Sequence, residues 1–238
     1  AVLFASSPKS DWTICWGSFT MNRIEEIEHN LNIVRANIAA AASHPVTLIA
    51  VTKTFPVSDV QILKDLGIQE FGENRDSEGA EKSAQVTGNW HFQGQIQSNK
   101  LKSITSWASV IHSLDDPRHF EIIEKVAPHP LSIFLQVSLD GAHNRGGAGV
   151  DQLYQLAELV SGSATHTLAG LMSVPPVAMD PEAAYSQLSA IRTEFLARFP
   201  EANSLSAGMS GDYQLAISHG ATHVRVGSSI LGSRSPHR

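Results

Sequence analysis

The feature that most restricts the fold of this chain is a regular alternation of short apolar runs with segments of helical periodicity. The first run, VTLIAVT, is continuous and rich in β-branched residues, which is typical of a strand covered on both faces. Seven similar runs begin near Ile68, Asn89, Ser109, Leu131, Thr167, Ser204 and Thr222. The segments between the runs have helical spacing over 57–66, 75–85, 98–106, 117–126, 150–162, 180–199 and 211–219.

This alternation predicts a parallel sheet, because the chain crosses back between parallel strands over a covering helix. Eight such units in 238 residues match the size of a closed (β/α)8 TIM barrel. An open doubly wound sheet is the alternative, but the GxGxxG turn usual in such folds is absent. We therefore expect one α/β barrel domain over residues 21–238. An extra N-terminal helix should precede it over 22–42, with an apolar stripe of Ile24, Ile27, Leu31, Val34 and Ile38.

Charge and cysteine content limit the partners and the cellular compartment that we expect. The formal charge is −6 and there is no run of like charges, so no basic stripe for nucleic acid or an anionic membrane is expected. The single cysteine, Cys15, permits no intrachain disulfide, which favours a reducing compartment such as the cytoplasm. Residues 1–20 match neither a signal peptide nor an anchor, and we expect a disordered extension or upstream sequence there.

Lys53 follows the first predicted strand, and in α/β barrels the active site lies at the carboxyl ends of the strands. Burial in a partly enclosed mouth lowers the pKa of a lysine, and the neutral amine can then form a Schiff base. The alternative is a strand-end lysine that extends its ammonium into solvent. Position alone leaves both interpretations open.

Two loops rich in glycine and serine follow the seventh and eighth predicted strands. They contain Ser206, Gly208, Ser210, Gly211, Gly227, Ser228 and Ser229. Backbone N–H groups, hydroxyls and a helix N-terminus in such loops can bind a phosphate dianion, and α/β barrels commonly hold phosphate at this position. Ordinary turns are the alternative for either loop alone. The coincidence of two such loops favours a phosphate site.

Arg225 lies inside the apolar run VRVG, where an unpaired guanidinium would be costly. Its partner is either a core carboxylate or the ring nitrogen of a pyridine cofactor. Because arginine cannot accept the ring proton, it would keep that nitrogen unprotonated and weaken the ring as an electron sink.

The histidines lack metal-binding spacing, since His91, His112 and His143 are isolated and no HExxH or HxH pair occurs. We expect no zinc site. His91 can stack or hydrogen-bond in the barrel mouth, or it can be a strand histidine with satisfied hydrogen bonds. A GxSxG elbow and a Walker loop are also absent from the sequence, which removes support for a hydrolase or nucleotide-triphosphatase.

Six motifs occur in order along the chain: LIAVTK, FGEN, WHFQGQIQSNK, GLMSVPP, LSAGMSGD and VRVGSSILG. Through them the chain, over about residues 22 to 234, resembles the YggS/PROSC family of pyridoxal 5′-phosphate (PLP)-binding, or PLP homeostasis, proteins. The resemblance implies a type III PLP fold, similar to the barrel domain of alanine racemase. It also implies a carrier or regulator of PLP and amino-acid balance, with no dedicated catalytic turnover.

The resemblance also implies roles for individual residues. Lys53 would hold PLP as a Schiff base, and Arg225 would approach the pyridine nitrogen. Ser210, Gly227 and Ser228 would hold the phosphate.

Further contacts are expected around the cofactor. Asn74 of FGEN would line its face, and Ser206 and Met209 would lie close by. His91, in the motif WHFQG, is the remaining candidate for a cofactor contact.

Two departures from the family pattern bear on function. Arg145 stands where the family usually has lysine, which preserves the charge but not the amine chemistry of a second PLP acceptor. Ser228 replaces threonine and retains the hydroxyl, so phosphate binding should persist.

Two other functions share parts of this pattern. A PLP-dependent amino-acid racemase needs acid/base groups on both faces of the substrate carbon, and alanine racemase takes one from a second domain that we do not expect here. A Schiff-base aldolase would use Lys53 and the phosphate loops without PLP. The favoured prediction is a monomeric PLP carrier whose partners are PLP-dependent apo-enzymes.

Overall fold

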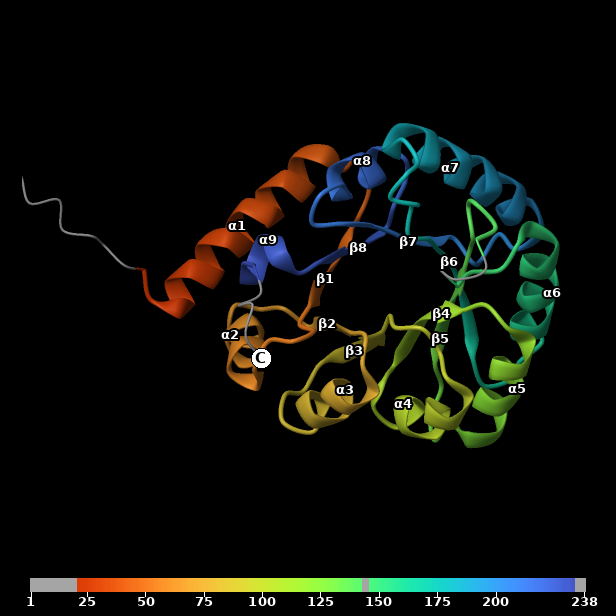
Figure 1. Cartoon of the computed structure of the whole chain (residues 1–238), viewed down its shortest axis with the longest axis horizontal. Coiled ribbons are helices and arrows are strands. Elements are labelled where there is room, and N and C mark those ends of the chain that lie inside the picture. The colour runs from red at the N-terminus through yellow and green to blue at the C-terminus, as the bar shows by residue number, and fades with distance from the viewer. Residues whose placement is uncertain (1–20, 143–145, 234–238) are drawn as a thin grey trace, which may run out of the picture.

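The computed structural model describes residues 21–142 and 146–233, and these ranges contain a closed barrel of parallel strands (Figure 1). Its strands are β1 (Thr47–Val51), β2 (Glu70–Glu73), β3 (Asn89–Phe92), β4 (Val110–Leu114), β5 (Ser132–Gln136), β6 (Thr167–Met172), β7 (Ser204–Met209) and β8 (His223–Val226). Each strand pairs with the next, and β1 also pairs with β8 in a register that joins Thr47 to His223. This closure confirms the predicted barrel and excludes the open doubly wound sheet.

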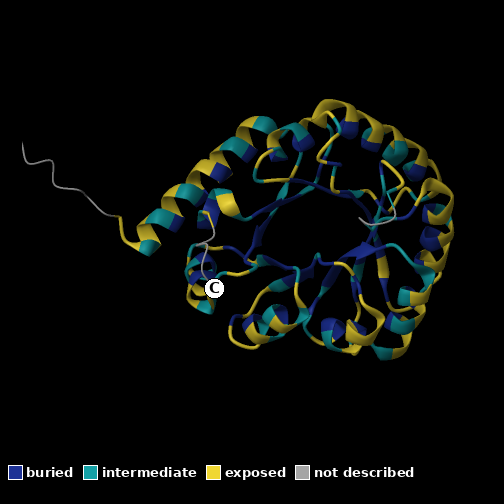
Figure 2. Cartoon of the chain, viewed as in Figure 1, coloured by how far each residue is buried: buried dark blue, intermediate teal, exposed yellow. Residues whose placement is uncertain are grey.

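Helices surround the barrel and join successive strands (Figure 1). They are α1 (Arg23–Ala41), α2 (Val57–Asp65), α3 (Asp76–Ser83), the 3-10 turn η1 (Ser98–Lys100), α4 (Leu101–Trp107), α5 (Pro117–Val126), α6 (Val150–Ser161), α7 (Pro181–Arg198), α8 (Tyr213–Ser218) and α9 (Ser228–Leu231). The predicted helical segments are confirmed to within two residues at each end. Figure 2 shows buried residues along the strands and on the inward faces of the helices.

The extra N-terminal helix α1 packs beside α8 and α9 on the outside of the barrel (Figure 1). Its start is fixed by a capping box, in which Asn22 Oδ1 accepts from Glu25 N and Glu25 Oε2 accepts from Asn22 N, both at 3.0 Å. The apolar stripe is buried as predicted at Ile27, Leu31, Val34 and Ile38. Ile24, which also fitted the stripe, is exposed at the start of the helix, so the predicted stripe was wrong at this position.

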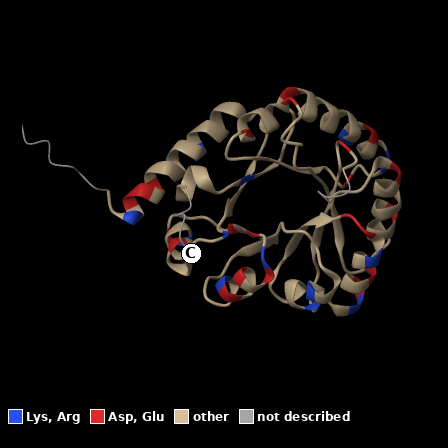
Figure 3. Ribbon diagram, in the orientation of Figure 1, with Lys and Arg blue, Asp and Glu red and all other residues tan. Residues whose placement is uncertain are grey.

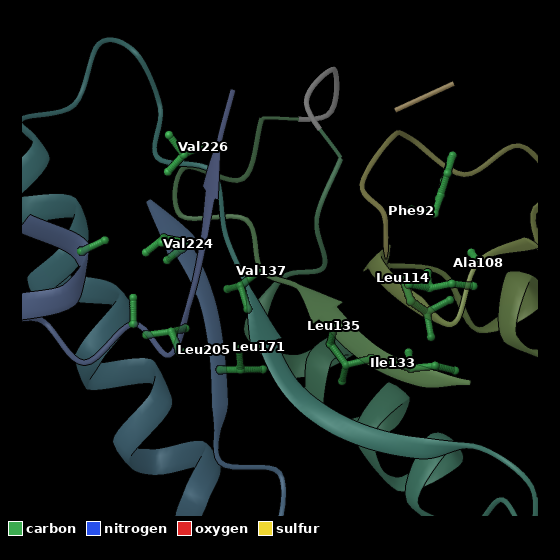
Figure 4. Packing of buried hydrophobic residues seen from close by; sticks show 14 of the residues in the cluster. Phe92, Ala108, Leu114, Ile133, Leu135, Val137, Leu171, Leu205, Val224 and Val226 are labelled. Carbon is green, nitrogen blue, oxygen red and sulfur yellow. The ribbon is translucent and has the colours of Figure 1, made fainter. Parts of the chain in front are cut away.

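The main hydrophobic core lies between the strands and the helices. Leu135, Leu171 and Leu205 are register neighbours on adjacent strands and are buried in this layer (Figure 4). Each such side chain contributes about 1.5–3 kcal/mol through burial. Since side chains alternate along a strand, Phe134 points the other way and belongs to a separate, small apolar cluster. There its ring stacks on His112 with 4.5 Å between centroids, so the barrel interior is partly polar.

Basic and acidic side chains are interspersed over the outer helices (Figure 3). Within 21–142 and 146–233, no helix has both the length and the apolar character needed to span a membrane. The prediction for residues 1–20 lies outside the described part of the chain.

Candidate functional site

A cavity of about 280 Å³ opens at the carboxyl ends of β1, β2, β3, β6, β7 and β8. Seven of the nine predicted cofactor contacts line it: Lys53, Asn74, Met209, Ser210, Arg225, Gly227 and Ser228. The other lining residues are Val51, Phe55, Gln93, Met172, Val174, Gly211 and Gly232. Barrel closure therefore brings residues from both ends of the chain to one small, mixed polar and apolar cavity.

Lys53 is half-buried and lies two residues beyond the end of β1. The next residue, Thr54, has φ of 70°, a left-handed conformation that is rare for a β-branched residue. Its N–H donates to Glu78 Oε2 at 2.6 Å, and this bond to a carboxylate offsets the strain. The backbone around Lys53 is thus held by an anchor on α3.

A buried ionic cluster lies behind this turn. Lys82 Nζ donates to Glu73 Oε1 at 2.6 Å and to the Thr52 carbonyl at 2.8 Å, and it lies 3.2 Å from Glu78 Oε2. Burial raises the pKa of Glu73, although hydrogen bonds from Lys82 and Thr52 oppose the rise. The cluster ties α3 and β2 to the strand end that carries Lys53. Sequence reasoning missed it, although Glu73 belongs to the FGEN motif and Lys82 follows nine residues later.

Arg225 is buried at the floor of the cavity. Its Nη1 donates to the carbonyl and to Oγ of Ser206 at 2.8 and 2.7 Å, and its Nη2 donates to the Ser173 carbonyl at 2.9 Å. These partners are neutral oxygens and not the core carboxylate of the alternative interpretation. Burial lowers the pKa of Arg225 to about 10, so the guanidinium stays charged at neutral pH.

The two glycine- and serine-rich loops meet at Ser210. Its Oγ accepts from the N–H groups of Gly227 and Ser229 at 3.2 and 3.3 Å, which leaves its own hydrogen to donate to an anion. Gly208 has φ of 91°, and a Cβ there would lie 2.6 Å from Ala216 Cβ, so this loop conformation requires glycine. The predicted phosphate-site residues therefore lie together at one end of the cavity.

Ser206 and His91 do not line the cavity. Ser206 is buried on β7 beneath Arg225 and bonds to its guanidinium. His91 is buried inside the barrel, where its nitrogens lie 2.8 Å from His112 Nε2 and 2.7 Å from Glu70 Oε2. Of the two interpretations of His91, the satisfied strand histidine is the one that this geometry fits.

Gln93 is a cavity residue that sequence reasoning missed. It directly follows β3, as a residue at the barrel mouth should, and its buried Nε2 has no hydrogen-bond partner within the described ranges. The next residue, Gly94, allows the loop after β3 to approach the backbone of Asn74, because a Cβ at Gly94 would lie 2.0 Å from the Asn74 carbonyl oxygen. The glycine of the HFQG motif thus lets the β3 loop pack against FGEN.

The cavity combines a lysine amine, an arginine that can only donate, and a group of hydroxyl and backbone N–H donors. These groups can capture an aldehyde, hydrogen-bond an unprotonated ring nitrogen and hold a phosphate. Among residues 21–142 and 146–233, no cluster of three His, Cys, Asp or Glu side chains could hold a metal ion.

Comparison with known proteins supports this interpretation of the cavity. Residues 23–235 match the family model of the alanine racemase N-terminal domain. The pyridoxal phosphate homeostasis protein of Corynebacterium glutamicum is 40% identical over 200 residues, which cover 79% of this chain and 90% of the relative. This chain belongs to the PLP homeostasis protein family. The resemblance to the YggS/PROSC proteins is thereby confirmed.

Solved structures extend the comparison of this PLP homeostasis family member. PipY of Synechococcus elongatus, solved with PLP bound, has a TM-score of 0.77 and 29% identity, covering 87% of this chain and 100% of PipY. Alanine racemase of Clostridium difficile 630, in complex with cycloserine, has a TM-score of 0.71 at 16% identity, covering 89% of this chain and 60% of the racemase. The second likeness confirms the fold alone. Arg145, the departure from the family lysine, lies outside the described residues.

Proposed function

We propose that this chain binds PLP and acts in PLP homeostasis as a carrier or regulator of the intracellular cofactor, with the aldehyde held as a Schiff base on Lys53. The observation that carries the proposal is the convergence of seven predicted residues on one cavity. The names of relatives such as the Corynebacterium glutamicum protein, and PLP bound to PipY, support it.

The donor groups of the cavity fit each part of PLP. The amine of Lys53 suits the aldehyde, and the hydroxyls of Ser210 and Ser228 suit the phosphate dianion, with Ser210 Oγ held in place by the N–H of Gly227. A Cβ at Gly227 would lie 3.0 Å from the Val51 carbonyl oxygen, so glycine lets this loop pack closely against the end of β1. Val51 and Phe55 supply apolar wall for the ring.

Bound PLP supplies an aldehyde that captures amines and a ring that withdraws electrons from them. Arg225 would restrain the second property, since it would donate to the ring nitrogen and cannot accept a proton from it. Lys53 and Arg225 are also the only ionisable side chains among the lining residues that the structure describes. Racemisation needs an acid/base group on each face of the substrate carbon. We therefore propose that the chain has no dedicated turnover.

The absorption spectrum with added PLP tests the central proposal. Wild-type protein should gain a visible band that Lys53→Ala lacks, and borohydride reduction followed by peptide mapping should place pyridoxyl mass on the Lys53 peptide. Lys100→Ala is the matched control, because Lys100 is exposed on η1 and should leave the band unchanged. A wild-type protein that stays colourless with PLP would overturn the proposal and favour a Schiff-base aldolase.

We further propose a cytoplasmic monomer that delivers PLP to PLP-dependent apo-enzymes. The single cysteine, Cys15, which permits no intrachain disulfide, supports the location. Light scattering measures the molar mass of the protein in solution and so tests the monomer. Reactivation of an apo-enzyme by the loaded protein, with a phosphatase present to destroy free PLP, distinguishes direct transfer from release. Racemase assays on the same preparation test the alternative function.

A further inference from the structure

A chain of hydrogen bonds crosses the barrel interior from Arg225 to the opposite end. Arg225 Nη1 lies 2.7 Å from Ser206 Oγ, and Ser206 Oγ lies 2.9 Å from His112 Nδ1. His112 Nε2 lies 2.8 Å from His91 Nδ1, and His91 Nε2 lies 2.7 Å from Glu70 Oε2. The four bonds join β8, β7, β4, β3 and β2. Apart from Glu70, whose side chain is 28% exposed at the start of β2, every member is buried.

The residues at the two ends of this row of hydrogen bonds, Glu70 and Arg225, decide which atom donates in each bond. Burial alone would raise the pKa of Glu70, but hydrogen bonds from His91 and Asn89 bring it below its usual value, so the carboxylate is ionised at neutral pH. An ionised carboxylate only accepts, and Arg225 at the other end only donates. Burial and the neighbouring His91 lower the pKa of His112 well below its usual value, so His112 is neutral.

When His91 and His112 are both neutral, the fixed roles of Glu70 as acceptor and Arg225 as donor determine which atom donates in each bond. His91 donates from Nε2 to Glu70, so its Nδ1 accepts from His112 Nε2. The Nδ1 of His112 then carries no hydrogen and accepts from the Ser206 hydroxyl. Ser206 Oγ in turn accepts from Arg225. Every bond has one donor and one acceptor, and all point from Arg225 toward Glu70.

We propose that Glu70, His91, His112 and Ser206 form a directional relay that positions Arg225. The protonation state of His91, which bonds to Glu70 at the amino end of the barrel, then controls how the guanidinium hydrogen-bonds to the cofactor. The relay deepens the proposed PLP function and depends on it for its effect at the cavity. Its four members are positioning residues, since none of them lines the cavity, whereas Arg225 does.

The relay has a second state that differs by one proton taken from solvent. When both nitrogens of His91 are protonated, its Nδ1–H donates to His112 Nε2, and the single proton of His112 then lies on Nδ1. His112 now donates to Ser206 Oγ, which accepts from both His112 and Arg225 and turns its own hydrogen away. The guanidinium of Arg225 then shares Ser206 Oγ as an acceptor with His112. The charged or titratable groups facing His91 and His112 are Glu70 from β2, and His223 and Arg225 from β8.

Nitrogen NMR of protein labelled with 15N-histidine tests the direction of the relay without PLP. Correlations from the ring carbon protons distinguish the Nε2–H tautomer, the Nδ1–H tautomer and the imidazolium, and single-histidine substitutions assign the signals among the 11 histidines. Where His91 and His112 are both uncharged, each should be the Nε2–H tautomer. An Nδ1–H tautomer at His112 beside an uncharged His91 would overturn the relay, whatever the protein does with PLP.

Glu70→Gln and Ser206→Ala test the coupling to the cavity. Ser206→Ala leaves two of the three Arg225 bonds and should raise the Kd for PLP about tenfold, the effect of one hydrogen bond to a charged group. Glu70→Gln keeps the side-chain shape but removes the far charge. It should shift the pH profile of the bound absorption band and of the Kd to lower pH, because the carboxylate that stabilises the imidazolium is gone.

His166→Gln is the matched control, because His166 is buried and bonds to Leu131 N outside the relay. It should leave the pH profile of the PLP band unchanged. A Glu70→Gln profile that superimposes on wild type would overturn the coupling, and so would an equal shift in His166→Gln. If wild-type protein fails to bind PLP, the proposed function fails, and the tautomer measurement still decides whether the relay exists.

Discussion

The ammonium of Lys82 lies 2.6 Å from Oε1 of Glu73, and both side chains are buried behind the turn that carries Lys53. The same ammonium donates to the Thr52 carbonyl, so one side chain of α3 ties β2 to the end of β1. A buried pair of this kind stabilises little in net terms, because desolvation opposes attraction, but it is costly to break. The pair therefore ties the backbone beside Lys53 to β2 and α3.

Lys82→Met should lower the free energy of unfolding by about 3–5 kcal/mol at pH 7, because it leaves Glu73 buried without its cation. Urea denaturation measures this loss. Lys64→Met is the control, since Lys64 bonds to Gln69 at the exposed surface and its removal should cost less than about 1 kcal/mol. Equal losses in the two variants would contradict a special role for the buried pair.

Gly208→Ala should destabilise the protein by about 3 kcal/mol or more, because φ is 91° and the added Cβ would lie 2.8 Å from Tyr213 Cα. Gly211→Ala, in the same loop, places its Cβ with no described atom within 4 Å and should change stability by about 0.5 kcal/mol or less. Thermal and urea unfolding of the two variants provide the comparison. A tolerated Gly208→Ala would mean that the loop has a different backbone conformation.

Stability should fall as the pH drops from about 6.5 toward 4. Burial, with repulsion from His91, lowers the pKa of His223 to about 4, while Glu70 opposes the shift. Between that value and the unfolded pKa of about 6.5 the unfolded chain binds more protons, so stability rises with pH in this window. The loss due to His223 should be about 3 kcal/mol at pH 4.

Urea unfolding at several pH values measures the slope. His223→Gln should make the slope shallower, whereas His29→Gln, on the exposed face of α1, should leave it unchanged. An unaltered slope in His223→Gln would assign the acid sensitivity to other groups, of which His112 is the first candidate because burial lowers its pKa well below the usual value.

Gln93→Met should leave the unfolding free energy nearly unchanged in the absence of PLP, because it removes a buried donor that has no partner in the described part of the chain. If the amide meets the ligand, the Kd for PLP should rise by about two- to tenfold. Titration by absorbance or fluorescence measures the Kd. The control is Gln95→Met, an exposed residue outside this cavity. Equal affinities in wild type and Gln93→Met would exclude a contact.

Much of the site could be predicted because it depends on strand ends. Lys53 follows a continuous apolar run and Ser210 follows another, and parallel strands in a barrel deliver their carboxyl ends to one mouth. His91 was harder to place, because Trp90 and Phe92 on either side pack against Trp107 of α4 and turn the histidine into the barrel. That direction depends on which face of the strand meets a helix.

The sequence by itself determined the order of strands and helices, and the helix bounds to within two residues, because hydrophobic periodicity is a local property. Tertiary structure alone decided which polar groups meet. Lys82 reaches Glu73 across two elements, and Ser206 lies under Arg225 because an irregular register between β7 and β8 sets their alignment. Such contacts join residues far apart in the chain, and they depend on strand register and barrel closure, which no local pattern encodes.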